Sequence, residues 1–167
     1  MLSFEEYVAA RRIALVRFAY LLTGERQLAQ DLVQEVLARI HQRWPSVQRS
    51  GSPDAYVKKA ILHQFLSWRR RRSATESVMA EPPNAAIAAD PATDYVERDA
   101  TWRLLATLPR RQRAVLVLRY YEDLDDSQIA AELGCAPSTV RAHASRAIGQ
   151  LRIVLAKDPI HPKGPAR

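Results

Sequence analysis

Apolar residues recur every four positions between Arg26 and Trp44. The repeat consists of Leu28, Leu32, Val36, Ile40 and Trp44, and Val33 and Leu37 widen it. A stripe with this period lies along one face of an α-helix, where it packs against a core. The pattern predicts an amphipathic helix from about Arg26 to Trp44. We expect Pro45 to stop it, because proline has no amide donor.

Helices are also expected on both sides of this one. Apolar positions keep helical spacing from about Ser3 to Leu22, and Thr23-Gly24 ends the pattern. Ser52-Pro53-Asp54 combines a capping hydroxyl, a first-turn proline and an early acidic residue, which together favour a helix start. The helix that begins there extends to about Arg72. The first part of the chain is therefore predicted to be a small helical domain.

Residues 125–151 have the pattern of a helix-turn-helix. Ala130 lets a second helix approach closely, Gly134 accepts the left-handed backbone of the turn, and Val140 fills the angle between the helices. Asp125 and Gln128 have the spacing of a capping box.

The second helix of this motif can begin at Pro137, since a first-turn residue needs no amide donor. Its outward positions are Ser138, Thr139, Arg141, Ala142, Ser145 and Arg146. Such a helix can enter a major groove and contact base edges. The alternative is an ordinary helical corner with a solvated basic face.

Charge divides the chain into blocks. The net charge of +7 comprises +7 in residues 1–72, −5 in 73–97, +4 in 98–157 and +1 in 158–167. A basic excess suits a polyanionic partner. Segment 73–97 has three prolines, no Lys or Arg and little apolar periodicity, so it is expected to be a flexible linker. Residues 158–167 are expected to be a disordered tail.

The helix expected over residues 53–72 mixes aromatic, basic and hydrogen-bonding side chains. Candidate DNA contacts on it are Lys58, Lys59, His63, Gln64, Ser67, Trp68, Arg69 and Arg70. Bases of single-stranded or melting DNA stack on aromatic rings, while cations follow the phosphates. The alternative is that the aromatic residues belong to the core. We expect this of Phe65, whereas Trp68 is open.

The polar face of the helix expected over residues 26–44 is a candidate docking surface. It carries Asp31, Gln34, Glu35 and Arg39. These groups suit a charged partner, but they also fit an ordinary solvated face with pairs such as Glu35–Arg39.

Other functional classes find little support in the sequence. The single cysteine, Cys135, rules out an intramolecular disulfide and fits a reducing cytosol. The histidines and this cysteine have no metal-ligand spacing, and no nucleophile–base pattern suggests a catalytic residue. No apolar run is long enough to span a membrane. We therefore expect a cytoplasmic protein with no metal, no cofactor, no membrane insertion and no enzymatic activity.

Residues 29–44, 53–72 and 108–152, in this order, resemble the extracytoplasmic-function (ECF) sigma factors of bacterial RNA polymerase. The resemblance covers about Phe4 to Leu155, and the arginine run after Ser67 resembles a sigma-E-like subgroup common in actinobacteria. It implies an all-α fold with a region 2-like bundle (1–72), a linker (73–97) and a region 4-like helix-turn-helix domain (98–157).

The resemblance also implies partners and roles. Asp31, Gln34, Glu35 and Arg39 would bind core RNA polymerase, and the 53–72 helix would bind and melt the minus-ten element. Arg111 would join the outward residues of the helix-turn-helix on the minus-thirty-five element. An anti-sigma factor is a further implied partner. Such a protein promotes promoter opening and transcription initiation.

The sequence departs from the family pattern at His63, where many members carry Asn, and at Ser67, where many carry Asp. These changes leave the identity of the captured base open. The alternative function is a stand-alone helix-turn-helix regulator. That protein would need a dimer interface to match palindromic half-sites, and no spare apolar helix obviously provides one.

Overall fold

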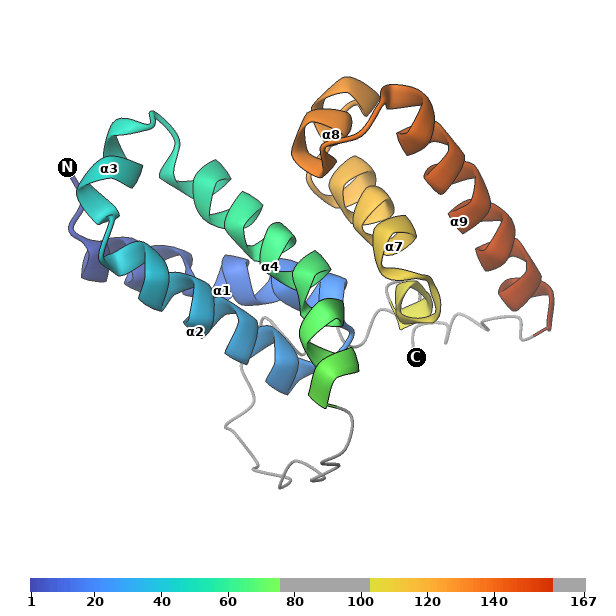
Figure 1. Ribbon diagram of the computed structural model, residues 1–167, viewed down its shortest axis with the longest axis horizontal. Coiled ribbons are helices and arrows are strands. Elements are labelled where there is room, and N and C mark those ends of the chain that lie inside the picture. The colour runs from blue at the N-terminus through green and yellow to red at the C-terminus, as the bar shows by residue number, and fades with distance from the viewer. Residues whose placement is uncertain (76–102, 158–167) are drawn as a thin grey trace, which may run out of the picture. The chain divides into compact units, whose positions relative to one another are not determined.

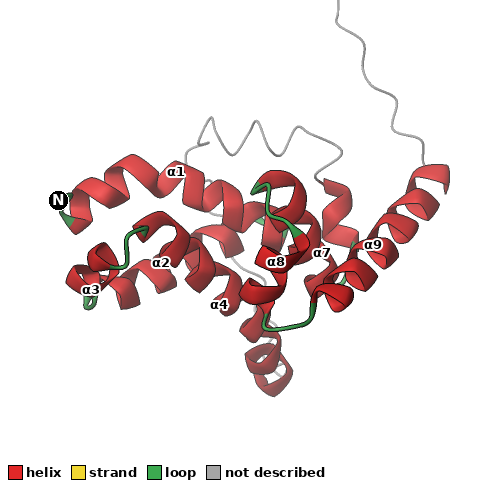
Figure 2. Ribbon diagram, turned by 90° about the horizontal axis from the view of Figure 1, so that it is seen from above, coloured by secondary structure: helices red, strands yellow, loops and turns green. Residues whose placement is uncertain are grey.

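The computed structural model describes residues 1–75 and 103–157 of the chain. Within these residues every regular element is helical and none is a strand (Figure 2). The chain divides into two compact units, Met1–Arg98 and Asp99–Arg167. The predicted all-α, two-domain fold is therefore confirmed. The predicted flexible linker, apart from its first three residues, and the predicted tail 158–167 lie outside the described residues.

The first unit is a small helical bundle (Figure 1). Its described helices are α1 (Phe4–Thr23), α2 (Arg26–His41), α3 (Trp44–Arg49) and α4 (Pro53–Thr75). The helices α1, α2 and α4 pack against one another, and Phe18, Leu32 and Phe65 are buried where they meet. The expectation that Phe65 belongs to the core is confirmed, since this residue is 2% exposed.

Local hydrogen bonds define both ends of α1. Ser3 Oγ accepts from the amide of Glu6 at 3.1 Å, and the Glu6 carboxylate accepts from the Ser3 amide at 2.7 Å. This capping box satisfies amides that have no partner inside the helix. At the other end Gly24 has φ 73°, and its amide donates to the carbonyl of Tyr20. Glycine takes this left-handed conformation without strain.

The predicted end of the second helix is wrong by three residues. Helix α2 ends at His41, and Trp44 and Pro45 lie in the first turn of the short helix α3. Proline is tolerated in a first turn, so Pro45 does not act as a stop. Trp44 packs against α1 and the N-terminal residues. Its ring centroid lies 4.8 Å from that of Tyr7, and its indole N–H donates to the Leu2 carbonyl.

The second unit contains the helix-turn-helix. Its described elements are η1 (Leu105–Thr107), α7 (Arg110–Leu116), the π-helical turn η2 (Val117–Tyr121), α8 (Asp126–Leu133) and α9 (Pro137–Lys157). Helix α9 packs on both α7 and α8. Val115, Ile129 and Val140 are fully buried in this unit.

The local signals of the helix-turn-helix are confirmed. Asp125 accepts from the Gln128 amide at 2.8 Å, and the Gln128 side chain accepts from the Asp125 amide at 2.9 Å. Gly134 has φ 64° and ends α8, while Pro137 begins α9.

In the first unit, the predicted end of the helix that begins at Pro53 differs from the structure. Helix α4 continues to Thr75, three residues into the segment assigned to the linker.

Candidate functional site

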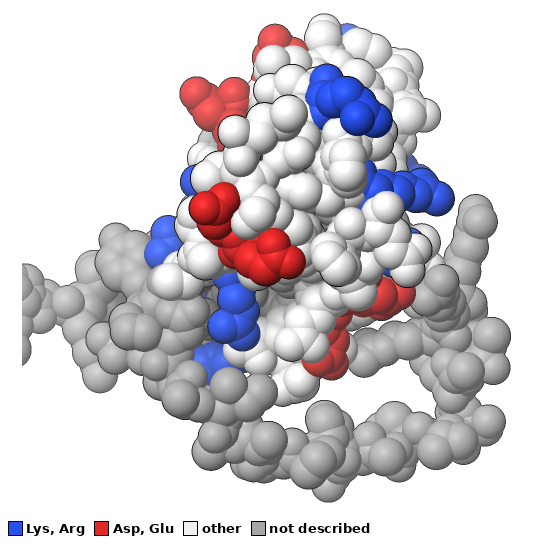
Figure 3. Space-filling view, turned by 90° about the vertical axis from the view of Figure 1, so that its left-hand side faces the viewer, with Lys and Arg blue, Asp and Glu red and all other residues white. Residues whose placement is uncertain are grey.

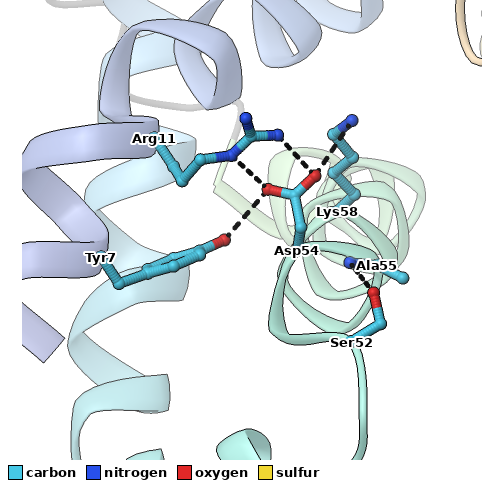
Figure 4. Close-up of polar contacts among 6 residues, drawn as sticks. All are labelled: Tyr7, Arg11, Ser52, Asp54, Ala55 and Lys58. Atoms are coloured by element: carbon cyan, nitrogen blue, oxygen red, sulfur yellow. Dashed lines mark hydrogen bonds and ion pairs between the residues drawn. The ribbon is translucent and has the colours of Figure 1, made fainter. Parts of the chain in front are cut away.

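A charged cluster fastens the start of α4 to α1 (Figure 4). Asp54 accepts two hydrogen bonds from Arg11, each 2.8 Å long, and a third from the Tyr7 hydroxyl at 3.3 Å. Lys58, one turn further along α4, lies 3.3 Å from the same carboxylate. Its ammonium group is also 6.0 Å from the ring centroid of Phe18. Lys58, predicted to contact DNA, is therefore engaged within the bundle.

The environment of Asp54 favours its charged form. Partial burial acts to raise the pKa of Asp54, but the Arg11 hydrogen bonds and the charges of Lys58 and Arg11 outweigh it and hold the pKa below its ordinary value. Burial raises the pKa of Tyr7, and the charge of Asp54 and the hydrogen bond to it raise it further. Tyr7 therefore acts as a neutral donor to an ionised carboxylate.

Replacing Asp54 with asparagine is expected to destabilise the first unit by about 1–2 kcal/mol, since several charge-assisted bonds are lost in a partly solvated place. The folded pKa of Asp54 is depressed, so its contribution is present above the unfolded value of 3.8 and is lost as the pH falls through the folded pKa. Urea denaturation at pH 7 and pH 3 measures both effects. Asp31→Asn, a change at an exposed position of α2, is the control and should have little effect. Equal loss of stability in the two variants would contradict this role.

The polar face of α2 lies between two grooves. Asp31 is exposed and accepts a hydrogen bond of 2.9 Å from Gln27. Gln34 lies at the α1 edge, in a groove of about 310 Å³ that Phe4 and Leu37 also line. Glu35 and Arg39 lie toward α4. On the face drawn in Figure 3, acidic and basic side chains are interspersed among uncharged ones.

The groove between α2 and α4 brings one residue predicted to bind polymerase close to several residues predicted to bind DNA. It has a volume of about 610 Å³. Arg39 lines it from α2, and His63, Gln64 and Ser67 line it from α4. Arg39, from the set predicted to bind polymerase, therefore shares one surface with three residues from the set predicted to bind DNA.

The predicted DNA contacts on α4 differ in exposure. Lys59, His63 and Ser67 are exposed, and Trp68 is half-buried. Gln64 is only 5% exposed, and its side chain contacts α2. The side chains of Arg69 and Arg70 lie outside the part of the chain that the structure describes. Among the predicted DNA contacts whose side chains the structure describes, Lys59, His63 and Ser67 are therefore the most accessible to DNA.

In the second unit, the outward face of α9 agrees with the sequence. Its exposed residues are Ser138, Thr139, Arg141, Ala142, Ser145 and Arg146. Arg141 lies 3.8 Å from Asp126 at the start of α8, and Asp126 also pairs with Arg119. The Asp126 carboxylate at the start of α8 therefore lies near the Arg141 guanidinium without burying it, since the Arg141 side chain remains 62% exposed.

His143 is a residue that sequence reasoning considered only as a metal ligand. Burial lowers the pKa of His143, and the positive charges of Arg111 on α7 and Arg146 on α9 lower it further. Arg111 and Arg146, both predicted DNA contacts, therefore act on the same imidazole. The spacing of His143 and Arg146, which places them on one helix face, is the signal that could have revealed this cluster.

His143 is expected to make the second unit less stable in mild acid. Its folded pKa lies below the unfolded value of 6.5, so its contribution is present above that value and is lost as the pH falls through the folded pKa. The denaturation midpoint should fall between pH 7 and pH 5 by less in His143→Gln than in the unchanged chain. His41→Gln, at an exposed position of the first unit, is the control. The same fall with and without His143 would disprove the assignment.

Residues 1–75 and 103–157 contain neither a group of metal ligands nor a membrane-spanning helix. No group of three or more His, Cys, Asp or Glu residues there could hold a metal ion. None of the described helices is both long and apolar enough to cross a membrane.

Comparison with known proteins defines the class. Residues 8–75 match the family Sigma-70 region 2, and residues 98–151 match Sigma-70, region 4. The RNA polymerase sigma-E factor of Streptomyces coelicolor is 35% identical over 153 residues, which cover 91% of this chain and 85% of that protein. The sigma-E factor of Streptomyces avermitilis is 34% identical over 91% of this chain and 84% of that protein.

A solved structure agrees with these relatives. It is the co-crystal structure of the sigma factor RpoE with the anti-sigma factor NepR from Bartonella quintana, which is 26% identical with a TM-score of 0.68. The match covers 93% of this chain and 98% of that one. The chain therefore belongs to the ECF sigma factors of RNA polymerase, in a sigma-E-like group with actinobacterial relatives. Its function is transcription initiation with core polymerase at promoter DNA, as the resemblance implied.

Proposed function

We propose that each described surface has one task in initiation. The polar face of α2 binds core polymerase, the exposed side of α4 contacts the minus-ten element, and the outward face of α9 contacts the minus-thirty-five element. The observation that carries this division is the groove that Arg39 shares with His63 and Ser67. In this groove Arg39, a candidate for polymerase binding, lies beside His63 and Ser67, which are candidates for opening the DNA strands.

The second unit supports its part of the proposal by charge. Arg111 on α7 and Arg146 on α9 are two positive charges that act on His143, and Arg146 lies among the exposed residues of the recognition helix. Phosphate contacts fix the register of a protein on DNA, whereas contacts to base edges supply sequence preference. We assign Arg111 and Arg146 mainly to phosphates and Arg141 to bases.

Sequencing of RNA 5′ ends after transcription of sheared genomic DNA tests the function. Core polymerase with the full chain should start at sites that share two upstream elements, and core polymerase without it should not. If the chain instead bound palindromic DNA as a dimer and gave no new start sites, the stand-alone regulator would be the better description.

Three further proposals follow from membership of the family. The chain acts in the cytoplasm, where polymerase and DNA meet. The chemistry of RNA synthesis belongs to polymerase, so the chain is not an enzyme itself. An anti-sigma factor regulates it, a proposal supported by the anti-sigma complex of the Bartonella relative. A purified anti-sigma candidate should compete with core polymerase for the chain, and simultaneous binding of both would argue against this regulation.

A further inference from the structure

Gln64 is a polar residue in a core position. It lies on α4 between the buried residues Leu62 and Phe65, and it is itself only 5% exposed. Burying an amide costs free energy unless its hydrogen bonds are replaced. A methionine would occupy a similar volume without that requirement. Packing alone therefore does not account for an amide at this position.

Both ends of this amide bind charged side chains of α2. The Gln64 nitrogen donates to Glu35 at 2.9 Å, and the Gln64 oxygen accepts from Arg39 at 2.8 Å. A flipped amide would place its oxygen against the carboxylate and its nitrogen against the guanidinium, and both contacts would be repulsive. The two charged partners therefore fix the orientation of the Gln64 amide. The amide thus lies between two charges that are one helical turn apart.

The partners of Gln64 belong to the proposed polymerase-binding face. Arg39 is exposed and Glu35 is half-buried, so each has a side accessible to a partner and a side held by the amide. Long charged side chains lose rotamer freedom when an interface forms, which weakens binding. Side chains already held in one orientation avoid part of that cost.

We propose that Gln64 is a positioning residue for core polymerase rather than a DNA contact. Its amide holds Glu35 and Arg39 in the orientation that polymerase binds, so the core of the bundle presets the docking surface of α2. The inference rests on the proposed role of α2. It assigns Gln64, the buried residue among the predicted minus-ten contacts, to polymerase binding instead of DNA binding.

The test is the affinity of the full chain for core polymerase in Gln64→Met, with and without Glu35→Ala and Arg39→Ala. Alone, Gln64→Met should weaken binding about tenfold, the cost of ordering two free side chains. With both partners already truncated, the same change should alter the affinity less than about twofold, because nothing is left to position. Gln150→Met, the same change at an exposed position of α9, should leave affinity unchanged. Circular dichroism at the assay temperature verifies folding.

Each other result separates the alternatives. If Gln64→Met weakened binding equally in both backgrounds, Gln64 would act through the fold, and the proposal would be overturned. If only the truncation of Glu35 and Arg39 weakened binding, the inference would fail while the proposed role of α2 stood. If that truncation also had no effect, the proposed surface itself would be wrong. A changed preference among minus-ten sequences with unchanged polymerase affinity would make Gln64 a DNA contact and overturn the proposal.

Discussion

Replacing Asp31 and Glu35 together with alanine is expected to weaken binding to core polymerase by about 2–5 kcal/mol, the range for charged groups that become buried and paired in an interface. Asp31 is exposed, and within the described residues its side chain accepts a hydrogen bond from Gln27 of the same helix. Its carboxylate is therefore available to a partner. Titration of labelled core polymerase with the full-length variant measures the loss.

The control removes the same charge elsewhere in the first unit. Glu5 and Glu25 are exposed and lie outside the polar face of α2, so Glu5→Ala with Glu25→Ala should leave affinity nearly unchanged. Asp31→Ala alone measures the contribution of Asp31 to polymerase affinity without disturbing the hydrogen bond between Glu35 and Gln64. Unchanged affinity in Asp31→Ala with Glu35→Ala, at normal helicity, would remove the polymerase-binding assignment.

Arg141→Ala is expected to weaken binding to the specific upstream element by about 1–3 kcal/mol, with a much smaller effect on scrambled DNA. The reason is its place on the outward face of α9, where most of the side chain remains exposed. Arg146→Ala should weaken both DNAs alike and lower the salt slope by about one, as loss of a phosphate contact does. Fluorescence anisotropy at several salt concentrations distinguishes the two.

Arg152→Ala is the matched control for this pair. Arg152 is exposed on the same helix but lies beyond the predicted contact residues, so its loss should change neither preference nor slope by a comparable amount. An equal loss on specific and scrambled DNA in Arg141→Ala would show that Arg141 contacts phosphates instead.

Features that depend on neighbouring residues were predictable from the sequence. The capping box of Asp125 and Gln128, the left-handed Gly134 and the first-turn Pro137 all form as expected. Each depends on groups within one turn of helix, so the spacing of residue types is sufficient to specify it. The exposed set on α9 follows from the same helical periodicity.

The break between α2 and α3 shows where local rules are insufficient. The four-residue repeat continues through Trp44, yet the helix ends at His41. Trp44 is buried against Tyr7 of α1 and bonded to the Leu2 carbonyl, both more than 35 positions earlier in the chain. In addition, a proline in the first turn of a new helix and a proline just after the end of a helix look the same in the local sequence.

The sequence by itself determined the class of this protein, its helical composition, its division into two domains and the outward face of its recognition helix. Only the tertiary structure decided that Asp54 binds Arg11, that Gln64 lies buried between Glu35 and Arg39, and that Arg111 and Arg146 act on His143. The physical reason is range. Periodicity and capping act within a few residues, whereas these contacts join different helices, and their geometry exists only once the helices have packed.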